Sequence, residues 1–151
     1  MNALFDTGLL VDHLTGRPEA AAVFAAHRHG AISVISWVEL MSLAPSGLEE
    51  ATRTFLQRFE RLAINEAIAD RAVALQREYR SLTLPQALVY ATALINSLTF
   101  VSVDVPLDLQ RDAHVMVPYT RNAASSPSGG SGPPDEEPER RMMKNESSIG
   151  R

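Results

Sequence analysis

The feature that most constrains this fold is a repeated alternation of short apolar runs with longer stretches of helical periodicity. Four runs have the length and residue types of buried strands, and they cover residues 3–5, 31–35, 99–103 and 115–117. Between them, apolar residues recur every three or four positions, as on one face of a helix. Parallel strands need crossover connections, which helices usually supply. The sequence therefore predicts an α/β fold with a mostly parallel central sheet flanked by helices.

Helices are expected in the intervals between these runs. The first covers residues 8–14, and Pro18 opens the second because proline suits the first turn of a helix. Two apolar stripes, at residues 48–62 and 64–79, predict helices that each bury one face. A further helix follows Pro85.

The chain has room for one core of ordinary size, because it has 151 residues and is 45% hydrophobic. We place the domain at residues 1–119. Residues 120–138 are dense in Ser, Gly and Pro and cannot repay the entropy of ordering, so residues 120–151 are predicted to be a flexible tail. No apolar run approaches the roughly 20 residues of a membrane span, and no signal peptide is evident. We expect a cytoplasmic protein without membrane contact.

Composition narrows the chemistry available to the chain. The absence of cysteine excludes disulfides and thiolate metal sites, so a bound metal would need oxygen or histidine ligands. The four histidines show no zinc-like spacing with acids. Residues 1–119 hold nine Arg, no Lys and thirteen Asp or Glu, so this part carries the formal charge of −4. An acidic surface attracts nucleic acid poorly, so such a substrate would require metal ions and locally placed arginines.

Four polar positions are expected at one edge of the predicted sheet. Asp6 and Asp104 close strands, and Glu39 lies in the first turn of a helix that starts at Ser36. Gln86 lies in the first turn of a helix that precedes its strand, and such a crossover helix begins at the same edge. Ligands of open α/β sheets bind beyond the carboxyl ends of the strands. We therefore expect these side chains to converge on a binding site.

Three converging carboxylates favour a bound cation. Each close pair would repel by about 1 kcal/mol in water and about 4 kcal/mol at an effective dielectric near 20. Oxygen ligands suit Mg²⁺ or Mn²⁺, and one or two carboxylates can anchor Mg²⁺ beside a phosphate. The matching chemistry is metal-assisted hydrolysis of a phosphodiester bond.

Each candidate also has a structural interpretation. Ser36 and Glu39 have the spacing of a capping box, in which both side chains satisfy amides at the start of a helix. Thr7 could cap the helix at 8–14 or position metal-bound water. Asp104 could be an ordinary loop acid. If these interpretations applied to every position, the chain would be a structural interaction protein. Only the shared sheet edge favours a functional site.

Four segments in order resemble the PIN-domain ribonucleases, above all the VapC type of toxin. They are LFDTGLLVDHL at 4–14, ISVISWVELMSLA at 32–44, LPQALVYATAL at 84–94 and FVSVDVPLDL at 100–109. The resemblance implies a three-layer PIN-like fold over residues 1–119. It also implies an endoribonuclease dependent on Mg²⁺ or Mn²⁺, often a homodimer, which cleaves RNA and is held inactive by a cognate antitoxin.

The resemblance assigns roles to individual residues. Asp6, Glu39 and Asp104 match the acidic residues of the family, and Ser102 matches a hydroxyl that often orders metal or water. Asp108 matches an additional acid of many members.

The sequence departs from the family pattern at Gln86, where an aspartate normally follows the proline. Loss of that charge would weaken metal binding by about 1 to 4 kcal/mol, or roughly fivefold to several hundredfold. We therefore expect strongly reduced cleavage. Three accounts remain open: a weakened enzyme, a PIN-like module that binds an antitoxin or RNA without cutting, and an active-site variant of a harmful toxin.

Overall fold

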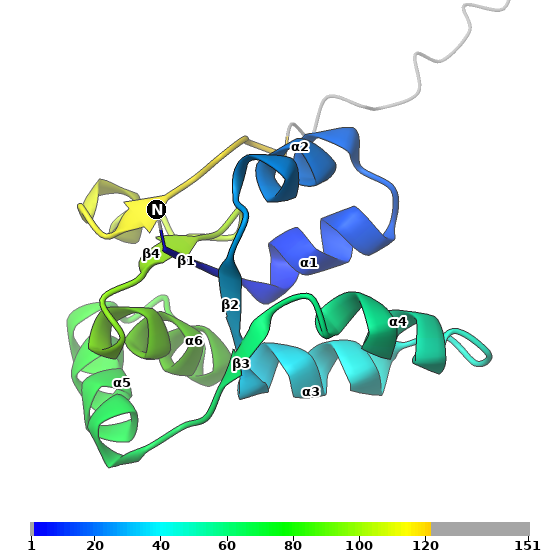
Figure 1. Ribbon diagram of the computed structural model, residues 1–151. Coiled ribbons are helices and arrows are strands. Elements are labelled where there is room, and N and C mark those ends of the chain that lie inside the picture. Colours follow the sequence, from blue (N-terminus) through cyan, green and yellow to red (C-terminus); the bar gives the residue numbers. More distant parts are fainter. Residues whose placement is uncertain (1, 122–151) are drawn as a thin grey trace, which may run out of the picture. The chain divides into compact units, whose positions relative to one another are not determined.

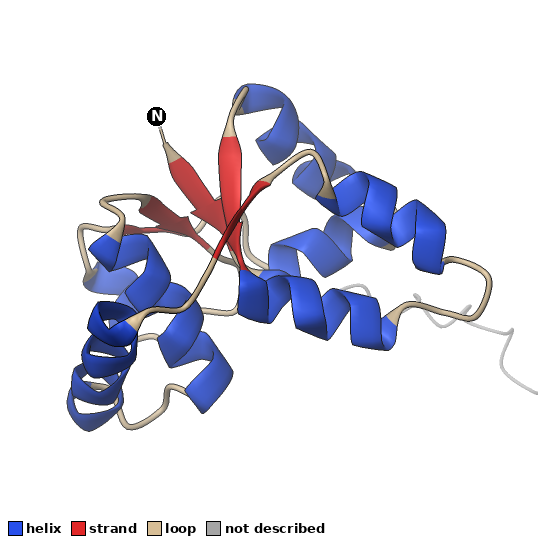
Figure 2. Cartoon of the chain, turned by 60° about the horizontal axis from the view of Figure 1, so that its bottom comes forward, coloured by secondary structure: helices blue, strands red, loops and turns tan. Residues whose placement is uncertain are grey.

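A five-stranded parallel sheet forms the centre of the structure, a computed structural model that describes residues 2–121. The strands are β1 (Ala3–Phe5), β2 (Gly30–Ser33), β3 (Glu60–Leu62), β4 (Thr99–Val101) and β5 (Val115–Met116). They lie in the order β3-β2-β1-β4-β5, and every neighbouring pair is parallel. Figure 2 shows the sheet between its helices. The predicted α/β class with a mostly parallel sheet is confirmed.

Helices connect the strands, and they are α1 (Thr7–Leu14), α2 (Pro18–Ala26), α3 (Val34–Leu43), α4 (Glu49–Leu56), α5 (Glu66–Glu78) and α6 (Leu84–Ile95). A short 3₁₀ turn, η1 (Leu109–Arg111), precedes β5. In Figure 1, α5 and α6 lie together on one side, and α1 to α4 lie on the other. None of the helices in residues 2–121 is long and apolar enough to cross a membrane.

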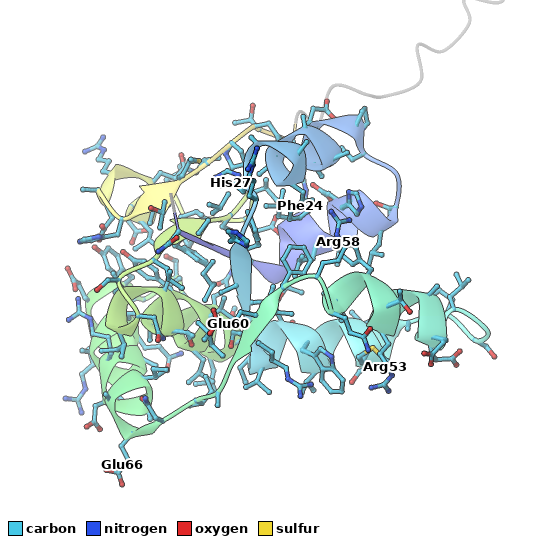
Figure 3. The ribbon with its side chains drawn as sticks, viewed as in Figure 1. Phe24, His27, Arg53, Arg58, Glu60 and Glu66 are labelled. Atoms are coloured by element: carbon cyan, nitrogen blue, oxygen red, sulfur yellow. The ribbon has the colours of Figure 1, made fainter. Side chains whose placement is uncertain are left out.

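The alternation of side chains along the strands divides the core between two helical layers. Leu4 and Phe100 are buried with the apolar faces of α5 and α6, where Phe100 contacts Tyr90 with ring centroids 5.1 Å apart. Phe5, on the other face, belongs to a cluster formed with α1 to α4. Its ring lies 4.9 Å from that of Phe24 of α2, which Figure 3 labels. Packing between the two helical layers holds β1 in place, and with it Asp6, the residue that follows the strand.

The predicted strand over 99–103 ends at Val101. Two further predicted boundaries are wrong, and both errors have a local cause. The helix predicted over 48–62 ends at Leu56, and Glu60–Leu62 forms the edge strand β3. This strand has three residues and is largely exposed, so it lacks the alternation that marks a half-buried strand. The helix expected from Ser36 begins at Val34, because the Ser33 hydroxyl accepts a hydrogen bond from the Ile35 amide and caps it.

The compact unit extends to Arg121, two residues beyond the boundary predicted at 119. The rest of the predicted tail lies outside the described residues.

Candidate active site

Asp6 lies where β1 ends and α1 begins, and its carboxylate is almost fully buried, with 6% of the residue exposed. One oxygen, Oδ1, accepts a hydrogen bond from the Thr7 amide at 2.8 Å and caps the helix. The other, Oδ2, accepts one from the Ser102 hydroxyl at 2.6 Å. Asp6 is therefore the N-cap of α1, and the interpretation of Thr7 as that cap is wrong.

Thr7 connects the start of α1 to α3. Its hydroxyl lies 2.9 Å from Oγ of Ser36 and 3.2 Å from Oε1 of Glu39. A threonine hydroxyl has one proton, so it can donate to the Glu39 carboxylate while accepting from Ser36. Because Ser33 caps α3, Ser36 lies inside the helix, and Glu39 lies in its second turn rather than its first. The interpretation of Ser36 and Glu39 as a capping box is therefore wrong.

Gln86 is engaged in capping α6. Its side-chain Oε1 accepts a hydrogen bond from the Thr83 backbone amide at 3.0 Å. Its backbone amide donates to the Thr83 hydroxyl at 3.4 Å. These reciprocal bonds make a capping box, a role for which Gln is well suited. Its Nε2 donates to the Asp104 backbone carbonyl at 3.4 Å. The amide oxygen is thus occupied by the helix cap, and the amide nitrogen holds the loop that carries Asp104.

Asp104 lies three residues beyond β4 and does not close the strand directly. Its amide donates to the Ser102 hydroxyl at 3.2 Å, so Ser102 connects Asp104 to Asp6. Its carboxylate accepts a hydrogen bond from Nη1 of Arg121 at 2.6 Å. The other oxygen, Oδ2, occupies the space that a Cβ on Gly8 would fill. Only glycine at position 8 allows the carboxylate to lie against α1 in this way.

These residues converge on one pocket of ≈ 280 Å³ at the carboxyl end of the sheet. Asp6, Thr7, Glu39, Gln86 and Asp104 all line it, and the remaining lining residues are Gly8, Thr83, Pro85 and Val89. Asp108 is not among them. Its carboxylate accepts hydrogen bonds from the Ser81 hydroxyl and the Leu109 amide, and it caps η1.

The electrostatics of the pocket fit a bound cation. The pKa of Asp6 is raised to about 6, chiefly by burial and to a lesser extent by the neighbouring charges of Asp104 and Glu39. The hydrogen bonds from Ser102 and Thr7 lower this pKa but only partly offset the increase. A buried carboxylate near two other acids is electrostatically unfavourable, and a divalent ion bound by these oxygens would remove the repulsion.

The carboxylates are not arranged as a finished ligand set. Within residues 2–121, no three side chains of His, Cys, Asp or Glu are grouped closely enough to hold a metal ion. Asp104 is paired with Arg121, and Glu39 with Thr7, so each makes other contacts. Metal binding would require at least Asp104 to change its partner.

Ser102 provides a direct test of the buried part of this site. Ser102→Ala is expected to lower the free energy of unfolding by about 1 to 3 kcal/mol at pH 7, because it removes a donor from the buried, ionised Asp6. The matched control is Ser81→Ala, which removes an exposed hydroxyl bonded to Asp108 and should change stability little. Urea unfolding in EDTA measures both. Equal effects of the two substitutions would contradict this assignment.

Sequence reasoning missed the residues that hold Asp104 from the side of α1. Arg121 lay in the predicted tail, yet it contacts Asp104, Asp12 and the Gly8 carbonyl. The available signal was Asp12, an acid four positions after Gly8 and therefore on the same face of α1.

The comparisons with known proteins agree with this fold. The family model described as PIN domain matches residues 3–108. A chain of a toxin-antitoxin complex from Klebsiella pneumoniae is 38% identical, with a TM-score of 0.73 over 79% of this chain and 99% of that one. No protein of curated function matches the chain significantly.

More distant solved structures share the fold. A chain of FitAcB from Neisseria gonorrhoeae is 20% identical, with a TM-score of 0.64 over 78% of this chain and 98% of that one. A chain of VapBC2 from Rickettsia felis, bound to a DNA fragment from its promoter, is 18% identical, with a TM-score of 0.60 over 77% of this chain and 96% of that one. The family match covers most of the sequence and includes every lining residue of the pocket, so this chain belongs to the PIN-domain family.

Proposed function

We propose that this chain is a metal-dependent endoribonuclease of the VapC toxin type, weakened by Gln86. The observation that carries the proposal is the buried Asp6, whose pKa is raised to about 6 and which shares its pocket with Asp104 and Glu39. PIN domains are generally nucleases, and the pocket of this chain lies at the sheet edge where such a site is expected.

Asp6 and Asp104 would hold one Mg²⁺ or Mn²⁺ ion, with Glu39 as a further ligand or as a partner of its water. The ion when bound would polarise the scissile phosphate and acidify the attacking water. Ser102 keeps Asp6 in position through a short hydrogen bond, and the Thr7 hydroxyl orients Glu39. Glu39 can accept a proton from water at the pocket. Gln86 contributes neither charge nor proton acceptance, which is why cleavage should be slow.

The solved relatives support an antitoxin partner. The 38% identical chain belongs to a toxin-antitoxin complex, and several structures of the same fold are VapBC or FitAB assemblies. We propose that this chain also binds a cognate antitoxin, that it forms a homodimer, and that RNA is its substrate. The acidic charge of residues 1–119 is consistent with metal-assisted rather than purely electrostatic attraction of RNA.

The test is cleavage of total RNA by an excess of the full-length chain, in Mn²⁺, in Mg²⁺ and in EDTA. Slow cleavage that requires the divalent ion and disappears in Asp104→Asn would support the proposal. Cleavage that persists in EDTA would point to a contaminating nuclease or to metal-independent chemistry.

The second candidate is a PIN-like module that binds an antitoxin or RNA without cutting. Two observations favour it: position 86 is an amide where the family resemblance implies an aspartate, and Asp104 is paired with Arg121. This candidate predicts RNA or antitoxin binding with no cleavage at any divalent concentration. It also predicts that restoring the acid at position 86 creates no activity.

The pH dependence of metal binding offers a further prediction. The pKa of Asp6 is raised to about 6, so Asp6 is ionised above this pH and protonated below it. A metal ligand must be deprotonated, so Mn²⁺ affinity should be constant from pH 7 to 8 and fall up to about tenfold per pH unit below pH 6. Calorimetric titration between pH 5 and 8 measures this. An affinity that stays level down to pH 5 would show that Asp6 is not a ligand.

A further inference from the structure

One arginine of this chain connects α1 to the pocket carboxylate that the proposed metal requires. Arg121 donates from Nε and Nη2 to the two carboxylate oxygens of Asp12, at 2.9 and 2.8 Å. Its Nη2 also donates to the Gly8 carbonyl at 2.9 Å, and its Nη1 donates to Oδ1 of Asp104 at 2.6 Å. A single guanidinium thus contacts both a structural acid and a candidate metal ligand.

The contacts with α1 anchor this guanidinium independently of Asp104. Burial alone would raise the pKa of Asp12, but hydrogen bonds from Arg121 and Tyr119 outweigh it, and the pKa of Asp12 is lowered. Asp12 is therefore a buried, ionised partner, and its fork-shaped pairing with Arg121 is the strong kind of ion pair. The contact with Asp104 is more open, since 41% of the Asp104 side chain is exposed.

We propose that Arg121 competes with the divalent ion for Asp104 and so sets the metal affinity of the pocket. The inference rests on the proposed function, because it assumes that Asp104 is a metal ligand. Both Asp104 oxygens are turned toward α1 in this structure, one toward Arg121 and the other against Gly8. An ion entering the pocket must take this carboxylate from the arginine, and the anchored positive charge remains near the bound ion.

The charge alone predicts a measurable effect. Removing one positive charge at about 5 Å from a divalent ion should increase the affinity for that ion by at least roughly tenfold, even at the dielectric of water. Without Arg121, the Asp104 carboxylate is also free to turn toward the pocket, which should increase the metal affinity further. A purely structural arginine would not have this effect, since its removal would only loosen α1.

The test is calorimetric titration of Mn²⁺ into the full-length chain and its variants at pH 7.5. Arg121→Gln should bind Mn²⁺ at least about tenfold more tightly than the unmodified chain. The matched control is Arg17→Gln, because Arg17 lies 3.7 Å from Asp12 but has no contact with Asp104. Because its charge lies farther from the pocket, Arg17→Gln should change Mn²⁺ affinity much less than Arg121→Gln. In an Asp104→Asn background, Arg121→Gln should keep only the part of its effect that comes from the charge, so the increase should be smaller.

Arg121→Lys covers the case in which Arg121→Gln does not fold. The lysine ammonium keeps a positive charge beside Asp12, but it cannot bridge Asp12 and Asp104 as the guanidinium does. Arg121→Lys should therefore tighten Mn²⁺ binding, but less than Arg121→Gln does. Unchanged or weaker binding in the folded Arg121 variants, beside measurable binding by the unmodified chain, would overturn the inference and leave the proposed metal site intact. Absence of Mn²⁺ binding in all variants, Gln86→Asp included, would overturn both.

Discussion

Gln86→Asp is expected to raise Mn²⁺ affinity by roughly fivefold to several hundredfold, and divalent-dependent RNA cleavage should rise with it. The substitution adds a negative charge to a pocket already lined by Asp6, Glu39 and Asp104. The new carboxylate also lies in the first turn of α6, where a negative charge interacts favourably with the helix dipole. Calorimetry and cleavage of total RNA measure the two effects separately.

Gln86→Asn is the matched control for this substitution. It shortens the side chain to the length of aspartate and keeps it neutral, so any change caused by length or by loss of the Thr83 capping bond appears in both variants. Asn should leave metal affinity near that of the unmodified chain. If Asp and Asn behaved alike, or if Asp left turnover unchanged, the charge at position 86 would not explain reduced activity.

Asp6→Asn is expected to abolish Mn²⁺ binding and cleavage while stabilising the metal-free fold at neutral pH. The pKa of Asp6 rises from 3.8 to about 6 on folding, so the folded chain binds a proton more readily than the unfolded chain. The resulting stability is fully present below about pH 4 and is lost as pH rises through about 6, a change of about 3 kcal/mol for a shift of this size. Asparagine has no such titration.

Urea unfolding in EDTA at pH 4 to 8 tests this prediction. Asp6→Asn should gain up to about 3 kcal/mol over the unmodified chain at pH 7, and the difference should shrink toward pH 4. Asp104→Asn is the control, because it should also weaken Mn²⁺ binding yet breaks an exposed ion pair of small value. Equal pH profiles for the Asp6 variant and the unmodified chain would contradict a strained, buried Asp6.

The fold was largely accessible from the sequence, because strand and helix periodicities differ and strands β1, β2, β4 and β5 carry apolar side chains. Strand β3 was not predicted, because Glu60–Leu62 is a short and exposed edge strand. Its one apolar residue, Leu62, also fits a helical stripe. The start of α3 was misplaced because β-branched residues at its first turn favour a strand, whereas the Ser33 cap favours the helix.

The sequence could predict only the part of the site that follows from the direction of the strands and helices. Asp6 follows β1, and the start of α6 lies at the same sheet edge, so a shared pocket could be expected for them. The partners of each carboxylate depend on side chains far apart in sequence. Arg121 meets Asp12 across 109 positions, and Ser102 meets Asp6 across 96. Hydrophobic periodicity cannot predict such long-range contacts. These contacts determine which carboxylates are already hydrogen-bonded.

The most direct test of the central claim is an anomalous difference map from crystals of the full-length chain soaked in Mn²⁺. We expect a peak in the pocket at about 2.1 Å from a carboxylate oxygen of Asp6 and one of Asp104, close enough to Glu39 for direct or water-mediated contact. In the same crystals the hydrogen bond between Arg121 and Asp104 should be lengthened or broken. A pocket without Mn²⁺, or Mn²⁺ bound only elsewhere, would contradict a metal-dependent nuclease built on these residues.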